Sequence, residues 1–167
     1  MRTLGRHLIA ELYGCDKKSL SAVDKVQGVM IAAAKAANAT VIDSVFHRFS
    51  PWGVSGVVVI EESHFAIHTW PEHGYASVDL FTCGAGTRPW AAFERLKKDF
   101  KAAYFSVIKL ERGLMSKQAL PGGLPCRLKI PVTRAGWTKG NLPPKGGWSV
   151  GLCAPPKRRS APGGRSK

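Results

Sequence analysis

The chain has 167 residues, which suits one domain of ordinary size with a hydrophobic core. No run of about 18 apolar residues occurs, and the basic segment 1–14 does not read as a secretory leader, so we expect a cytoplasmic protein without a membrane span. The four cysteines have no CxxC spacing, which favours free thiols and argues against a zinc site. No other cluster of metal ligands is visible.

The net charge of +14 is concentrated towards the C-terminus. Residues 120–167 hold ten of the 25 basic residues, none of the 11 acidic ones, eight of the 11 prolines and nine of the 18 glycines, so the rest of the chain carries only +4. Such a composition buries too little apolar surface to offset the entropy of ordering the backbone. The chain is therefore expected to divide into a folded domain, 1–116, and a basic, mostly disordered tail, 117–167.

One strand and one helix are expected at the start of the domain. The apolar segment 8–13 is bounded by glycines and predicts a buried strand. A helix is expected to follow, capped by Asp16 or Ser19 and running to about Asn38, because apolar residues recur there every three or four positions.

Four strands are expected in the middle of the domain. Residues 40–49 alternate between apolar and polar side chains, and residues 54–60 are β-branched and apolar. The segments 65–70 and 75–82 are separated by four residues, Pro-Glu-His-Gly, a length that hairpins favour. A largely antiparallel sheet follows from these short connections.

A second helix and a last strand complete the domain. Pro89 suits the first turn of a helix, and apolar side chains then repeat at helical spacing. The final strand is expected at 104–110. The order β-α-β-β-β-β-α-β, with both helices on one face, predicts an α+β two-layer sandwich. Because the other face of the sheet would lack cover, we expect a homodimer in an αββα arrangement.

Reactive side chains are densest in residues 61–84, EESHFAIHTWPEHGYASVDLFTCG. This segment holds three of the five histidines, a serine after two glutamates, and a cysteine. Because strand side chains alternate between faces, His64 and His68 point to one face and Ile67 to the other. The hairpin should therefore have one polar and one packed side.

Three motifs in this segment, Glu-Ser-His, His-Thr-Trp-Pro-Glu and Asp-Leu-Phe-Thr-Cys-Gly, follow Phe-His-Arg-Phe at 46–49 and Gly-Val-Ser-Gly at 53–56. In order and spacing they resemble the prokaryotic S-adenosylmethionine decarboxylases, over about residues 5–113. The resemblance implies a pyruvoyl-dependent lyase that converts S-adenosylmethionine to S-adenosylmethioninamine, the aminopropyl donor of spermidine biosynthesis. The tail after about Ser116 departs from the usual length of the family.

The resemblance implies that the chain cuts itself between Glu62 and Ser63, giving a β chain, 1–62, and an α chain, 63–167. Ser63 would become the pyruvoyl group, so no external cofactor is required. Chemically, the serine hydroxyl attacks the preceding carbonyl, and elimination and hydrolysis leave a keto-acyl group. That carbonyl would hold the substrate amine as a Schiff base and accept the electrons of decarboxylation.

The resemblance assigns His68 as proton acceptor and Ser55 as a second helper in processing, and Cys83 as proton donor in decarboxylation. An imidazole suits proton transfer near neutral pH. Taken alone, His68 would more often be a structural histidine and Cys83 a small buried apolar residue. Asp79, on the same hairpin, fits an ion pair as readily as a catalytic role.

The resemblance also places Phe49 and Trp70 beside the adenine of the substrate, with Glu72 accepting hydrogen bonds from the ribose. A sulfonium cation favours electron-rich rings nearby. Taken alone, the two aromatics would be core or interface residues, and Glu72 a solvated turn residue.

Three alternatives remain open from the sequence. The same scaffold could decarboxylate arginine or ornithine, because substrate choice resides in the pocket rather than in Ser63. The basic tail could make the protein a nucleic-acid-binding module, although the body has no nucleic-acid motif. The chain could also be a homologue that does not process itself and serves as a structural or regulatory subunit.

Overall fold

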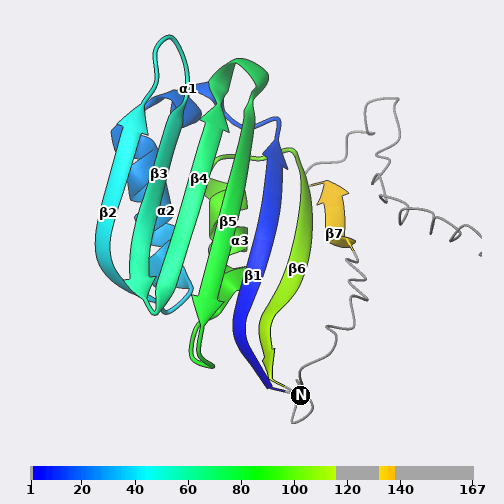
Figure 1. Cartoon of the computed structure of the whole chain (residues 1–167). Coiled ribbons are helices and arrows are strands. Elements are labelled where there is room, and N and C mark those ends of the chain that lie inside the picture. The colour runs from blue at the N-terminus through cyan, green and yellow to red at the C-terminus, as the bar shows by residue number, and fades with distance from the viewer. Residues whose placement is uncertain (1, 116–131, 138–167) are drawn as a thin grey trace, which may run out of the picture.

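The computed structural model describes residues 2–115 and 132–137. One layer is a sheet of seven strands in which all neighbours are antiparallel (Figure 1). The strands are β1 (Arg2–Tyr13), β2 (Thr40–Arg48), β3 (Val54–Glu61), β4 (Ser63–Trp70), β5 (Tyr75–Cys83), β6 (Tyr104–Met115) and β7 (Val132–Trp137). Their spatial order is β2-β3-β4-β5-β1-β6-β7, which confirms the antiparallel sheet expected from the short connections.

The second layer consists of helices on one face of the sheet, so the α+β two-layer sandwich is confirmed (Figure 1). These are α1 (Lys17–Ser21), α2 (Val23–Ala36) and α3 (Pro89–Asp99), and a 3-10 turn, η1 (Pro71–His73), joins β4 to β5. Helix α2 packs on β2 and β3, and α3 packs on β1 and β5. No helix among the described residues is long and apolar enough to cross a membrane.

The sequence predicted one continuous helix where the structure has α1 and α2. The break is at Ala22, whose backbone is extended (φ −98°, ψ 116°). The carbonyl of Leu20 accepts a hydrogen bond from the Thr69 hydroxyl (3.0 Å), so a tertiary contact satisfies an acceptor near the end of α1. Asp16 is the N-cap of α1, as expected, and accepts from the backbone N–H of Ser19 (3.0 Å).

The core lies between the sheet and the helices. Along β4 the burial alternates, so that Phe65 and Ile67 are buried while His64 and His68 are exposed. The polar and packed sides expected for this hairpin are thereby confirmed. The largest fully buried side chains are Phe65, Phe93, Phe100, Leu8, Leu12, Leu20, Met30, Ile60, Ile67, Leu80 and Leu96.

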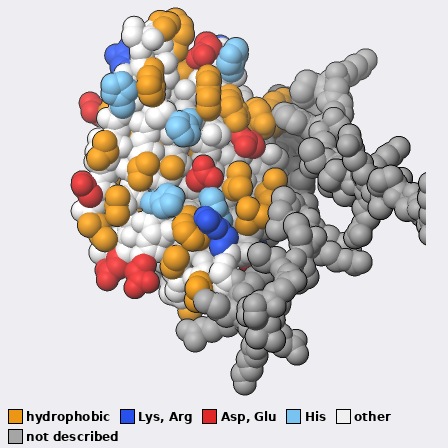
Figure 2. Space-filling model, in the orientation of Figure 1, with side chains coloured by type: hydrophobic (Ala, Val, Ile, Leu, Met, Phe, Trp, Pro, Cys, Tyr) orange, Lys and Arg blue, Asp and Glu red, His pale blue; other side chains and the backbone are white. Residues whose placement is uncertain are grey.

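The sheet face opposite the helices, called the open face below, carries a mixture of side-chain types. Figure 2 shows hydrophobic side chains, histidines and carboxylates interspersed across it. Its exposed apolar members include Val45, Val57, Val59 and Trp70. A soluble domain rarely exposes so many large apolar groups on one face without a use for them.

Strand β7 lies inside the segment expected to be a mostly disordered tail. It pairs with β6 from Tyr104 opposite Trp137 to Ile108 opposite Val132. A sheet edge presents unpaired N–H and C=O groups, which a further strand can satisfy. The other residues of the expected tail, 117–131 and 138–167, lie outside the described residues.

Candidate functional site

Ser63 stands at the tip of the β3–β4 hairpin, where it pairs with Ile60 across two exposed glutamates. The backbone φ of Ser63 is +147°, a region that side-chain-bearing residues rarely adopt and that therefore indicates strain. Its hydroxyl oxygen is buried and has no hydrogen-bond partner among the described residues. A strained backbone and an unsatisfied nucleophile thus coincide where the sequence predicts the cut.

Cys83 lies at the same end of the sheet as Ser63. Ser63 pairs with Thr82 on β5, and Cys83 is the next residue along that strand. Its thiol is free and the residue is partly exposed. The loop that follows is held by Arg6, whose guanidinium donates to the carbonyl oxygens of Gly84 (2.9 Å) and Thr87 (2.9 Å).

Ser55 and His68 face each other across β3 and β4, with 2.7 Å between the serine Oγ and the histidine Nδ1. His68 is exposed on the open face. It is five residues along β4 from Ser63, which is about 16 Å at the usual rise of a strand. The structure therefore brings these two helpers together but does not bring them to Ser63 within one chain.

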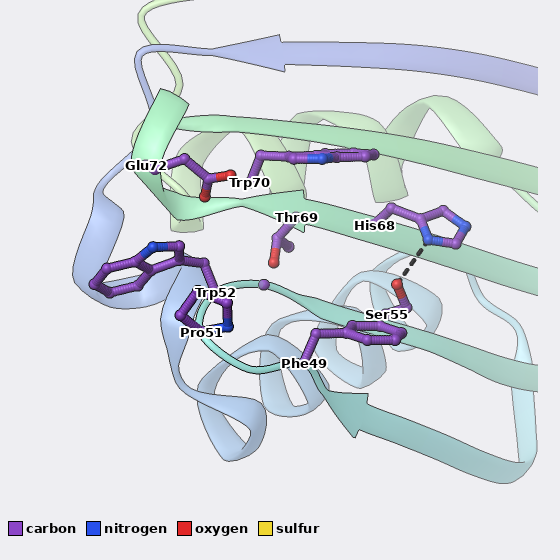
Figure 3. A pocket seen from close by; sticks show the side chains of 9 residues that line it. Phe49, Pro51, Trp52, Ser55, His68, Thr69, Trp70 and Glu72 are labelled. Atoms are coloured by element: carbon purple, nitrogen blue, oxygen red, sulfur yellow. Dashed lines mark hydrogen bonds between the residues drawn. The ribbon is translucent and has the colours of Figure 1, made fainter.

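A cavity of about 300 Å³ lies beside this pair, a size at the lower end of ligand pockets. All three residues predicted to bind the nucleoside, Phe49, Trp70 and Glu72, line it together with Ser55 and His68 (Figure 3). The remaining lining residues are Pro51, Trp52, Gly53 and Thr69.

The floor of the cavity is fixed by Thr69, which is only 5% exposed. Its hydroxyl accepts from the backbone N–H of Val54 (2.8 Å) and bonds to the carbonyl of Leu20. The turn that follows Phe49 is pinned against the same residue, because Gly53 has φ +97° and a Cβ there would lie 2.7 Å from the Thr69 carbonyl oxygen. The cavity is thus formed by a turn and two strands that are held together by specific contacts.

The centre of the open face carries a hydrogen bond between His7 Nε2 and Asp79 Oδ1 (3.0 Å). This bond, with further help from the nearby His68 and His64, holds the pKa of the Asp79 carboxyl below its usual value against the opposing effect of partial burial. Asp79, which the sequence left open between an ion pair and a catalytic role, is thus hydrogen-bonded to His7.

An aromatic stack runs from the cavity towards the centre of the sheet. The ring of Tyr75 stacks on Trp70 (5.1 Å between centroids) and on Tyr13 (5.0 Å). The Tyr75 hydroxyl donates to Glu11. Burial first, and then this hydrogen bond, raise the pKa of Tyr75 well above its usual value. Trp70 is therefore held in place by its neighbours.

Sequence reasoning missed Trp52, Thr69 and the His7–Asp79 pair. Alternation within one strand places side chains on a face but cannot say which strands are neighbours, and β1 and β5 are far apart in the chain. Within residues 2–115 and 132–137, no group of three or more His, Cys, Asp or Glu side chains is arranged to hold a metal ion.

Comparison with known proteins gives a consistent result. A model of the S-adenosylmethionine decarboxylase family matches residues 6–113. The S-adenosylmethionine decarboxylase proenzyme of Thermotoga maritima is 53% identical over 130 residues, which cover 78% of this chain and all of that protein. The proenzyme of the same name from Moorella thermoacetica is 54% identical over 115 residues, 69% of this chain and 92% of that protein. The crystal structure of the adenosylmethionine decarboxylase from Aquifex aeolicus superimposes with a TM-score of 0.66 at 36% identity, covering 72% of this chain and 99% of that one.

Proposed function

The chain belongs to the S-adenosylmethionine decarboxylase family, and on that premise we propose that it releases carbon dioxide from S-adenosylmethionine by means of a pyruvoyl group made from its own Ser63. Its activity is that of a carboxy-lyase, and the product is S-adenosylmethioninamine, an aminopropyl donor. The observation that carries the pyruvoyl assignment is the buried, unpaired hydroxyl of Ser63 on a strained backbone.

Self-cleavage follows from the position of this hydroxyl. The Ser63 oxygen bonds to the carbonyl carbon of Glu62 as the peptide C–N bond breaks, which gives an ester and a free amine. Loss of the α-proton of Ser63 and departure of the Glu62 carboxylate then leave a dehydroalanine. Its imine tautomer takes up water and releases ammonia, leaving a ketone. Relief of the strain at φ +147° favours the first step.

The residues around Ser63, where β4 begins and β5 ends, suit the decarboxylation step. When formed, the ketone supplies an electron-accepting carbonyl for the amine of the substrate, and no external cofactor is needed. Cys83 ends the strand beside Ser63 and can donate the proton that replaces the lost carboxyl group. Thr82, which pairs with Ser63, is fully buried and keeps this end of the two strands in register.

The cavity suits a nucleoside sulfonium substrate. Phe49 and Trp70 are 48% and 39% exposed and present aromatic rings to the cavity, which favours both a purine and a sulfonium cation. Glu72 supplies a carboxylate for ribose hydroxyls. Arginine and ornithine lack a purine and would leave these rings without a partner, so S-adenosylmethionine is the preferred substrate.

A homodimer joins the two parts of the site. Since Ser55 and His68 lie about 16 Å along the hairpin from Ser63, they can assist its cleavage only if they come from a second copy of the chain. A two-fold pairing of open faces would cover the exposed valines of β2 and β3, and we infer that it brings the Ser55–His68 pair of one copy to the β3–β4 tip of the other. This is the αββα arrangement expected from the sequence.

The decisive experiment compares the wild type with Ser63→Ala by intact mass and by release of carbon dioxide from carboxyl-labelled S-adenosylmethionine. The wild type should yield fragments of 62 and 105 residues, the larger without a free N-terminal amine, and should be active. Ser63→Ala should remain one inactive chain. Ser21→Ala, which removes a half-buried serine hydroxyl on α1, is the matched control and should behave as the wild type.

Two results would contradict the proposal. Turnover by the uncut Ser63→Ala variant would remove the pyruvoyl mechanism. Carbon dioxide release from labelled arginine or ornithine, with none from S-adenosylmethionine, would keep the mechanism but assign a different substrate.

A further inference from the structure

Trp52 is a large apolar side chain that is 60% exposed and yet lines the cavity. Figure 3 shows its indole on the same side of the cavity as Glu72, with Ser55 and His68 on the opposite side. The indole of Trp70 lies between these two sides, and the ring of Phe49 is on the side of Ser55. The cavity therefore has a polar end, where Ser55 and His68 are hydrogen-bonded, and an aromatic end closed by Trp52.

The turn that carries Trp52 is held in place on both sides. Before it, the backbone N–H of Phe49 donates to the carbonyl of Gly53 (2.9 Å). After it, Gly53 approaches the Thr69 carbonyl too closely to admit a side chain, and the next residue, Val54, donates its N–H to the Thr69 hydroxyl. The turn is therefore organised before any ligand arrives, which lowers the entropic cost of binding through Trp52.

The orientation of the substrate follows from the two ends. The reacting carbons of S-adenosylmethionine belong to its amino-acid part and must meet the Ser55–His68 end, where the proposed dimer brings Ser63 of the second copy. The purine is the part of the substrate furthest from those carbons. It therefore extends towards Glu72 and Trp52.

We propose that Trp52 forms the purine-side wall of the substrate pocket and determines affinity for the nucleoside without taking part in bond breaking. The proposal rests on the proposed function, because it assumes a nucleoside substrate. An indole offers a broad face to a purine, and bases stack favourably on aromatic side chains of proteins. No other role for Trp52 is apparent in the fold, since its ring is neither buried in the core nor part of the aromatic stack of Trp70, Tyr75 and Tyr13.

Binding to the uncut chain tests the proposal without catalysis. In the full-length Ser63→Ala background, calorimetry would measure the affinity for S-adenosylmethionine and for 5′-methylthioadenosine, which keeps the nucleoside but lacks the amino acid. Adding Trp52→Ala should weaken both by about tenfold, in line with the loss of one stacking contact. Trp52→Phe should restore most of the affinity. Ile42→Ala removes an apolar side chain of similar exposure (64%) outside the cavity and is the matched control.

The self-processed enzyme gives the second measurement. Trp52→Ala alone should cut itself completely, raise KM for S-adenosylmethionine about tenfold and change kcat by less than about twofold, the pattern expected for a residue that binds ground state and transition state alike. Unchanged affinity and KM in Trp52→Ala would overturn the proposal, and so would a fall in kcat at unchanged KM. Failure of the proposed function is distinct, because it would appear in the wild type as absence of carbon dioxide release from S-adenosylmethionine.

Discussion

The two ends of the β3–β4 hairpin differ in how well their polar groups are satisfied. At the tip, Ser63 has a strained backbone and a hydroxyl without a partner. At the other end, Ser55 and His68 are hydrogen-bonded to each other, and the Thr69 hydroxyl both donates and accepts. The unpaired hydroxyl and strained backbone at the tip suit a single self-cleavage reaction. The satisfied hydrogen bonds at the cavity end suit a binding site that keeps its shape through many turnovers. Because strands are stiff, a single chain cannot bring the two ends together, and we assign that task to the dimer.

The largest expected effect is on self-cleavage, in mixed dimers where one chain lacks Ser63 and the other lacks His68. Ser63→Ala and His68→Ala should each remain uncut when expressed alone. When the two variants are co-expressed with different tags, the His68→Ala chain should be cut, because its intact Ser63 meets the intact His68 of the other chain. The intact mass of each chain in the purified mixed dimer shows whether the His68→Ala chain has been cut.

Two outcomes would break this picture. If the His68→Ala chain stays uncut inside the mixed dimer, the composite site is wrong. If it is cut when expressed alone, His68 is not needed for processing.

The two described thiols, one near each end of the hairpin, should differ strongly in reactivity. Cys15 lies beside the turn at the cavity end, with its backbone N–H bonded to the Gly74 carbonyl (2.8 Å). Burial, with a smaller contribution from the charge of Asp16, raises the pKa of Cys15 to about 12. At pH 8 only about one Cys15 in 10⁴ would then be the reactive thiolate.

Iodoacetamide at pH 8 should therefore label the partly exposed Cys83 and leave Cys15 unmodified, as read by peptide mass mapping. In urea both should be labelled, which controls for peptide recovery. Labelling of Cys15 as fast as Cys83 in the folded protein would show that the cavity end opens readily.

Two glycine substitutions should change stability in opposite directions. Gly53→Ala places a Cβ at φ +97° and 2.7 Å from the Thr69 carbonyl oxygen. We therefore expect the free energy of unfolding to fall by about 2 kcal/mol or more. The melting temperature should fall by about 8 °C or more. Gly28→Ala is the matched control on α2, where a Cβ meets nothing within 4 Å and should add about 0.5–1 kcal/mol. Equal melting temperatures for the two variants would mean that the turn carrying Trp52 is not held as described.

The smallest expected effect is on stability, when the Asp79 carboxyl is removed. Asp79 pairs with Ala66, midway along β4. The folded-state pKa of this carboxyl is lowered by its bond to His7, so its contribution to stability is present above the unfolded pKa of about 3.9 and is lost as the pH falls through the lower folded value. Because 39% of the side chain is exposed, Asp79→Asn should cost less than about 1 kcal/mol at pH 7. Urea unfolding at fixed protein concentration should show this difference at pH 7, and the difference should shrink as the pH is lowered below the unfolded pKa. A difference that does not change with pH would assign the effect to packing instead of charge.

Much of the fold could be predicted from local patterns. Alternation of side chains located the four strands from 40 to 82 to within one residue at each end, apart from the start of β4, which lies two residues earlier than expected. The start of that strand was missed because Ser63 adopts a backbone that its neighbours in sequence do not suggest. The break at Ala22 was also missed, since it depends on a hydrogen bond from Thr69, 49 residues away from Leu20.

The candidate site divides in the same way. The family resemblance of the motifs predicted Ser63, Ser55, His68 and Cys83 as functional residues, and the structure adds where they lie. It places the first and last at one end of the sheet and the other two beside the cavity. Trp52 gave no signal in the sequence, because its turn is local whereas the cavity it lines also contains residues of β4.

The sequence by itself determined the order of the elements from β1 to β6, apart from the break between α1 and α2, and the two-layer class, because periodicity is a local property of the chain. Only the tertiary structure decided that Ser63 is strained and has an unpaired hydroxyl, that Asp79 bonds to His7, and that His68, about 16 Å along β4 from Ser63, lines a cavity. Each of these depends on which strands become neighbours, and that is fixed by burial of the whole core.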